Sequence, residues 1–301
     1  MENILKTGSS SIILGSKYYE GHFPIKPYKL LKITKIIDNH NEFKYLDKVK
    51  KITNYEDYYA IPDDEKVLLD KDSIFFNKLK LLMKKENMGI FDTSLHVLYI
   101  DYAGSYDIID SLDHLLINGV SDVWKNCGSI LNFTKQMVGA IKYLHDIKLC
   151  HLDVKPENIM ISIKNGEYIF KLIDFGFCAL EPFDDFVKHY KGTPGYYPSH
   201  FDSIKYIQPG LPKIYANDMD VVNGVLKMAI NRKLVYKIDS YCLGRVINYV
   251  YYHFLQSYIS ICCLDFEYTK KQKINKIIGL LLEKSSEKRV SIIELYYMNI
   301  L

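Results

Sequence analysis

Residues 150–160, CHLDVKPENIM, crowd several polar side chains into a turn. An apolar, helix-like run precedes this turn and a β-branched run follows it. A surface loop can be polar without a particular reason, but a polar turn held between two core segments is a candidate for chemistry. The polar residues of the turn are His151, Asp153, Lys155, Glu157 and Asn158.

A second acidic turn follows a predicted hairpin. The strand-like runs NIMISI (158–163) and YIFKLI (168–173) flank Asn165-Gly166, the strongest short-range signal of a β-hairpin. The sequence Asp-Phe-Gly, 174–176, comes directly after the second run. A hairpin returns the chain to its start, so Asp153, Asn158 and Asp174 are expected to converge. Two carboxylates and an amide oxygen suit Mg²⁺, which prefers hard oxygen ligands.

The elements around these turns divide the chain into two parts. Up to about residue 100, strand-like runs alternate with a helical pattern and a charged, partly helical segment. From about residue 107, long helical patterns dominate. The sequence therefore predicts a small sheet-bearing lobe followed by a larger helical lobe. The strand candidates are 11–15, 28–33 and 95–100; the helix candidates are 41–52, 72–87, 127–147, 217–231, 240–263, 271–283 and 291–299.

Composition excludes several classes of protein. The hydrophobic content of 48% and charged content of 25% are those of a globular chain, and a net charge of +3 argues against nucleic acid as the main partner. The six cysteines show no metal-binding spacing, which favours reduced core thiols. No signal peptide is recognisable at the N-terminus. The uncharged stretch 246–264 is interpreted as a buried helix rather than a membrane span.

The sequence HLDVKPEN, followed by a strand–turn–strand and DFG, resembles the catalytic loop and metal-binding turn of protein kinases. The resemblance implies an α+β, two-lobed fold forming one kinase domain over residues 1–301. Its N-lobe, residues 1–102, would hold a small antiparallel β-sheet with one main helix. A hinge would lie at about 101–106, and residues 107–301 would form a mostly helical C-lobe.

The resemblance also assigns roles in the transfer of phosphate from ATP. Asp153 would orient the acceptor hydroxyl and take its proton, and Lys155 would place a positive charge near the transferred group. Asn158 and Asp174 would hold Mg²⁺. Thr193, in KGTPGYYP, would help to seat the acceptor; together with Lys155 it is typical of serine/threonine kinases.

Residues 5–15, LKTGSSSIILG, are similar to a degenerate form of the family's glycine-rich loop. Lys32 is the expected ATP-binding lysine, with Lys29 and Lys35 as alternatives, and Glu42 is its expected partner. Ile100 would guard the back of the adenine pocket. The remaining nucleotide-binding residues implied by the resemblance are Gly8, Ser9, Ser10, Ser11 and Ile13 in the loop, the backbone of Asp101 and Ala103 for adenine, and Asp107 for the ribose.

The chain departs from the family in ways that bear on regulation. Leu152 stands where an arginine normally receives the activation-loop phosphate, and residues 177–192 contain no Ser or Thr, so activity is expected without phosphorylation there. His200 replaces the glutamate that pairs with the arginine matching Arg289, while Asp239 remains to brace the catalytic loop. An insertion around 205–235 lies where it could shape substrate choice.

The expected function is therefore a monomeric serine/threonine kinase that uses MgATP on a protein substrate. The alternative is a pseudokinase, a binding scaffold without useful turnover; a small-molecule or lipid kinase is disfavoured by the acceptor-seating stretch. The compact, degenerate form is similar to kinases of large DNA viruses. A cytoplasmic location is expected, including that of a virus-infected cell, with no membrane span and no nucleic-acid partner.

Overall fold

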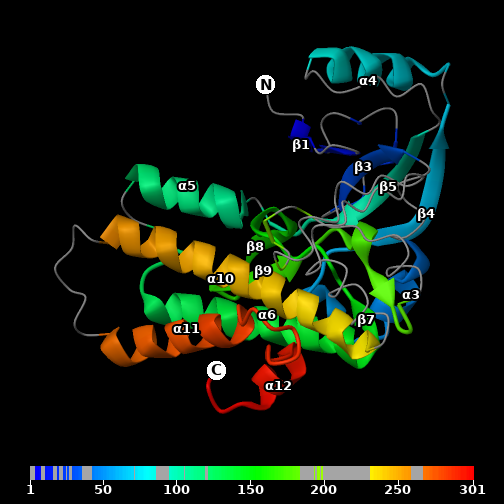
Figure 1. Ribbon diagram of the computed structural model, residues 1–301. Helices are drawn as coiled ribbons and strands as arrows, with labels where there is room; N and C mark the ends of the chain where they lie inside the picture. Colours follow the sequence, from blue (N-terminus) through cyan, green and yellow to red (C-terminus); the bar gives the residue numbers. More distant parts are fainter. Residues whose placement is uncertain are drawn as a thin grey trace, which may run out of the picture. The chain divides into compact units, whose positions relative to one another are not determined.

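The computed structural model describes residues 4–7, 11–15, 19, 23–24, 26, 29–35, 43–70, 72–85, 95–104, 106–118, 121–183, 193, 195–196, 198, 231–258 and 267–301. These residues form two compact units (Figure 1). Unit 1 comprises residues 1–51 and 60–103, and unit 2 comprises 52–59 and 104–301.

Unit 1 is built on an antiparallel five-stranded sheet with the order β1-β2-β3-β5-β4. Within it, β2 and β5 match two strands predicted from sequence, and β3 covers the third. The charged strand β4 was not predicted, because its sequence PDDEKVLL lacks apolar alternation. The strands are β1 (Ile4–Thr7), β2 (Ser11–Leu14), β3 (Lys29–Lys35), β4 (Pro62–Leu69) and β5 (Leu95–Asp101).

One face of this sheet carries a hydrophobic core. Alternate residues of a strand point to opposite faces, so Leu31 and Ile33 of β3 and Val97 and Tyr99 of β5 share that face. Helix α4 (Ile74–Lys85) packs Phe75, Phe76 and Leu79 into the same cluster. The predicted helix at 41–52 is represented by a single turn, α3 (Leu46–Val49), together with residues outside the described part.

Unit 2 consists mainly of helices. Helices α6, α10 and α11 lie side by side in Figure 1. Asn126 begins α6 because its side chain accepts a hydrogen bond from the Ser129 N–H, and Ser291 with Glu294 forms a capping box on α12. The helices are α5 (Ile108–Asn118), α6 (Cys127–Asp146), α10 (Tyr236–Tyr258), α11 (Tyr268–Leu281) and α12 (Ile292–Tyr297).

Short strands complete unit 2. The hairpin β8–β9 is joined by β6 at one edge, and β7 pairs with β10 as a separate ribbon. None of the described helices is both long enough and apolar enough to cross a bilayer. The helix predicted at 217–231 lies outside the described residues except for Asn231. The strands are β6 (Tyr106–Asp107), β7 (Leu149–Cys150), β8 (Ile159–Lys164), β9 (Glu167–Leu172) and β10 (Ala179–Leu180).

Candidate active site

The hairpin β8–β9 brings the two acidic turns together, as the sequence predicted. Asn165 and Gly166 adopt positive φ angles of 54° and 81°, the conformation that a tight two-residue hairpin turn requires. The paired strands run back from this turn until Ile159 lies opposite Leu172. Beyond that pair, the Ile173 N–H donates to the Asn158 carbonyl at 2.9 Å. Asn158 therefore lies beside the residue that precedes Asp174.

Asp153, Lys155 and Thr193 form a connected polar group. The Thr193 hydroxyl donates to Asp153 Oδ1 at 2.5 Å, and Lys155 Nζ donates to the same hydroxyl oxygen at 2.9 Å. Lys155 Nζ also lies 2.9 Å from Asp153 Oδ2. Asp153 is 4% exposed, so its negative charge is compensated by this ammonium within a buried setting. The group holds an alcohol oxygen between a carboxylate and a cation.

Asn158 and Asp174 supply oxygen atoms beside this group. The Asn158 amide nitrogen donates to Asp153 Oδ2 and to the Asp153 carbonyl, both at 2.9 Å, and its oxygen is the atom that these bonds do not use. Asp174 has a left-handed backbone, φ 64°, and accepts a hydrogen bond from the Gly176 N–H; its side chain is exposed. A carboxylate and an amide oxygen form a hard donor set, which fits Mg²⁺.

Asp239, near the start of α10, holds the backbone of the loop that contains Asp153. Its Oδ2 accepts the His151 N–H at 2.9 Å and its Oδ1 accepts the Leu152 N–H at 2.7 Å. Leu152 has a φ of 63°, which is unfavourable for a leucine by about 1–2 kcal/mol. His145 Nε2 lies 2.9 Å from Asp239 Oδ2 as a third partner. The Asp239 carboxylate accepts hydrogen bonds from three donors. Its cluster with His145 and Cys150 is therefore interpreted as a structural hydrogen-bond network rather than a metal site.

His151 and Tyr59 pack around Phe175, the residue after Asp174. The His151 ring lies 5.3 Å from the Phe175 ring, and the Tyr59 ring lies 5.8 Å from it. The Tyr59 hydroxyl donates to the Ala140 carbonyl of α6 at 2.5 Å. His151 Nε2 lies 3.1 Å from the Ile173 carbonyl, and its Nδ1 accepts the Asp153 N–H at 3.3 Å, which fits a neutral ring. Burial lowers the pKa of His151, in agreement with that form.

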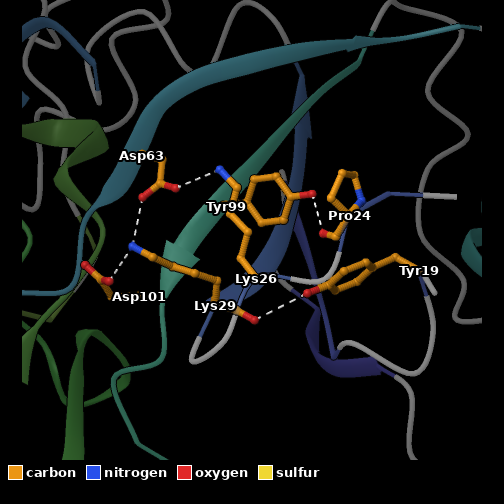
Figure 2. Close-up of polar contacts among 7 residues, drawn as sticks. All are labelled: Tyr19, Pro24, Lys26, Lys29, Asp63, Tyr99 and Asp101. Carbon is orange, nitrogen blue, oxygen red and sulfur yellow. Dashed lines mark hydrogen bonds and ion pairs between the residues drawn. The ribbon is translucent and has the colours of Figure 1, made fainter. Parts of the chain in front are cut away.

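On unit 1, the strand register separates Lys32 from Lys29. Lys32 pairs with Ile13 and Leu98, and therefore shares a face with them, opposite the α4 core. Lys29 lies on the core side instead and forms ion pairs with Asp63 at 2.8 Å and Asp101 at 2.6 Å (Figure 2). Lys29 is thus committed to two carboxylates, whereas Lys32 occupies the other face of the strand.

The predicted hinge residues lie where β5 ends. Asp101 is the last residue of β5, and Ala103 is buried two positions later. Gly104 follows with φ +135°, and a Cβ there would lie 1.9 Å from the Ile161 carbonyl oxygen, so only glycine fits. Asp107, expected at the ribose, is 3% exposed; its Oδ1 accepts the Asp110 N–H of α5 at 2.9 Å. The structure therefore uses Asp107 as a helix cap.

Several predicted residues lie outside the described part of the chain: Gly8, Ser9, Ser10, Glu42, His200 and most of the insertion at 205–235. Ser11 is described only through its backbone in β2. Arg289 is 1% exposed and donates to the carbonyls of Glu283, Lys237 and Lys284. Within the described residues it has no carboxylate partner, and burial lowers its pKa to about 10.

Sequence reasoning missed His145, Tyr59 and the Lys29–Asp101 pair. Each of these residues acts through a partner far along the chain: His145 through Asp239, and Tyr59 through Ala140 and Phe175. A single sequence contains no signal for such distant pairings. The only local signal was that Tyr59 is followed by the apolar residues Ala60 and Ile61, which favours burial of its side chain.

Comparison with known proteins agrees with this geometry. The family described as protein kinase domain matches residues 97–208. Serine/threonine-protein kinase ppk34 of Schizosaccharomyces pombe is 28% identical over 162 residues, which cover 54% of this chain and 41% of that protein. Serine/threonine-protein kinase chk-2 of Caenorhabditis elegans is 44% identical over 64 residues, 21% of this chain and 13% of that protein.

The antiparallel sheet, the helical unit and the catalytic-loop geometry define a protein-kinase-like fold. These matches support membership of the protein kinase superfamily. It spans well under two thirds of the relatives that it matches, and the matched relatives are named as serine/threonine kinases.

Proposed function

We propose that this chain transfers the γ-phosphate of MgATP to a serine or threonine hydroxyl of a protein. The observation that carries the proposal is the Thr193 hydroxyl, which donates to Asp153 Oδ1 at 2.5 Å while Lys155 Nζ contacts its oxygen at 2.9 Å. An acceptor alcohol needs the same two partners: a carboxylate to orient its proton and a cation near the developing charge.

Each residue of unit 2 would have one task. Asp153 would accept the hydrogen bond of the incoming hydroxyl, and Lys155 would stabilise negative charge on the transferred group. Thr193 would seat the acceptor beside them. Asn158 and Asp174 would hold Mg²⁺, which supplies charge neutralisation of the ATP phosphates when it is bound. His151 and Asp239 would keep the loop in shape without touching the substrate.

The nucleotide would draw its remaining contacts from unit 1. Lys32 is the proposed phosphate-binding lysine, because Lys29 is engaged by two carboxylates on the other sheet face. The backbone groups of Asp101 and Ala103 would bind adenine, and Ile13 shares the Lys32 face of the sheet. The loop residues Gly8 to Ser11 and Glu42 keep the roles that the resemblance implies. Asp107, which caps α5, would contact the ribose, as the resemblance implies.

The activity is proposed to need no phosphate on the activation segment. Leu152 carries no charge and is fully buried, so residue 152 cannot receive a phosphate. The absence of Ser and Thr from 177–192 supports the same view. The physiological substrate would be a protein. The enzyme would act as a monomer in the cytoplasm.

The test is transfer of labelled γ-phosphate from MgATP to a panel of Ser/Thr-rich proteins. Wild type should form phosphoserine or phosphothreonine, and Asp153→Asn and Asp174→Asn should lower the rate by about a hundredfold or more. Asp113→Asn, an equivalent change at an exposed position of α5, is the matched control and should act like wild type. Nucleotide binding by wild type without transfer to any acceptor would instead identify a binding scaffold.

A further inference from the structure

Four charged side chains of alternating sign lie at the end of the sheet of unit 1. Lys26 Nζ is 3.3 Å from Asp63 Oδ2, Asp63 Oδ1 is 2.8 Å from Lys29 Nζ, and Lys29 Nζ is 2.6 Å from Asp101 Oδ1. Figure 2 shows them as a chain that ends at Asp101. Their side chains are 23–34% exposed, so these ion pairs are screened less than pairs on an open surface.

The backbone around Lys29 is fixed independently of these charges. Lys29 and Asp101 are the final partners of the β3–β5 ladder, and the Tyr19 hydroxyl donates to the Lys29 carbonyl at 3.4 Å. Asp63 lies in the stretch of β4, between Pro62 and Lys66, where the register against β5 shifts. The backbone of Lys29 is therefore fixed in β3, and its ammonium contacts Asp101, the last residue of β5.

The Asp101 side chain depends on Lys29. Among the described residues, Lys29 Nζ is the partner of this carboxylate. Desolvation by burial lowers the pKa of Lys29, but the hydrogen bonds and charges of Asp101 and Asp63 outweigh it, so the pKa is raised. Desolvation likewise raises the pKa of Asp63, and Lys29 and Lys26 bring it below its ordinary value. Both shifts favour the charged forms of Lys29 and Asp63 at neutral pH.

We propose that Lys29 is a positioning residue for the nucleotide base, because its ammonium fixes Asp101 at the point where the backbone would meet adenine. This inference rests on the proposed assignment of adenine to the backbone of Asp101 and Ala103. It gives Lys29 and Lys32 of β3 different roles: Lys32 contacts the phosphates directly, and Lys29 positions the base through Asp101. Lys29 itself touches no part of the nucleotide.

The test measures the two halves of the nucleotide separately. Adenosine and Mg²⁺-tripolyphosphate are titrated against wild type, Lys29→Met and Lys32→Met. Lys29→Met should weaken adenosine binding by about five- to tenfold, the loss expected when roughly one hydrogen bond is misplaced, and leave tripolyphosphate binding unchanged. Lys32→Met should show the reverse pattern.

Lys26→Met is the matched control. It removes the same charge from the same network, together with the stacking of Lys26 over the Tyr99 ring at 4.2 Å, but leaves the Lys29–Asp101 pair in place. It should lower the melting temperature no more than Lys29→Met does, and it should keep the adenosine affinity of wild type. A merely structural role of Lys29 predicts equal effects of both variants on adenosine, which would overturn the proposal.

Three further outcomes are decisive. Loss of tripolyphosphate affinity in Lys29→Met would show that Lys29 contacts phosphate, against the proposal. If wild type binds tripolyphosphate but Lys29→Met binds adenosine normally, the positioning role fails and the kinase assignment stands. If wild type binds neither compound, the proposed function itself fails.

Discussion

His151 is a fully buried histidine whose two ring nitrogens are both engaged, one by the Ile173 carbonyl and one by the Asp153 N–H. Protonation would place a second N–H against that N–H, so the ring is held neutral. Burial lowers its pKa in the folded state, while the unfolded chain takes up a proton near the ordinary value of 6.5. Folding stability from this residue is therefore present above pH 6.5 and decreases as the pH falls below it.

We expect this loss to reach at most about 1.4 kcal/mol per pH unit in the free energy of unfolding. His151→Gln should remove that component, which is measured as the difference in pH dependence between the two proteins in chemical denaturation from pH 7.5 to 5.5. His114→Gln, at an exposed position of α5, serves as the control. Parallel curves for wild type and His151→Gln would show that His151 protonates freely in the folded protein.

At the scale of elements, residues 52–59 belong with unit 2 although they precede β4 in the chain. Tyr59 forms a bridge with Leu172, and the Leu172 N–H donates to the Tyr58 carbonyl at 2.8 Å. Asp57 pairs with Lys164 on the hairpin. The segment is thereby joined to β9 and, through the Tyr59 hydroxyl, to α6.

Tyr59→Phe keeps the ring against Phe175 and removes only the buried hydroxyl. It should lower the free energy of unfolding by about 1 kcal/mol, the usual net value of one hydrogen bond. Denaturant unfolding measures this change. Tyr106→Phe, which removes a hydroxyl from a side chain that is 55% exposed, should change stability little. Equal effects of the two variants would argue against a stabilising bond to Ala140.

Sequence predicted the elements whose signals are local. The hairpin with Asn165-Gly166 was found because two residues determine that turn, and α6 because its apolar spacing runs over twenty residues. Strand β4 was not predicted because the residues from Asp63 to Lys66 are all charged and its pairing with β5 is irregular. Likewise, the Lys29 pairs depend on strands brought together from residues 63 and 101, which no local pattern reveals.

At the scale of the whole molecule, the proposed function combines the catalytic roles of Asp153 and Lys155 with an uncharged Leu152 at the position expected to receive a phosphate. Treatment with a protein phosphatase should therefore leave the specific activity toward a protein acceptor unchanged, with complete dephosphorylation checked by mass spectrometry. The physical reason is that the buried Leu152 offers no positive charge to a phosphate. A fall in activity that is restored by preincubation with MgATP would contradict this expectation.

The two bonds from Asp239 to the His151 and Leu152 N–H groups have a wider consequence. They act on the backbone, so the left-handed geometry at residue 152 is enforced from α10 whatever side chain stands there. Under the proposed function, the shape of the loop and its response to a phosphate would therefore depend on separate positions: Asp239 holds the loop, and residue 152 would decide whether a phosphate is bound. A lineage could exchange one mode of regulation for another at residue 152 while its chemical machinery stayed intact.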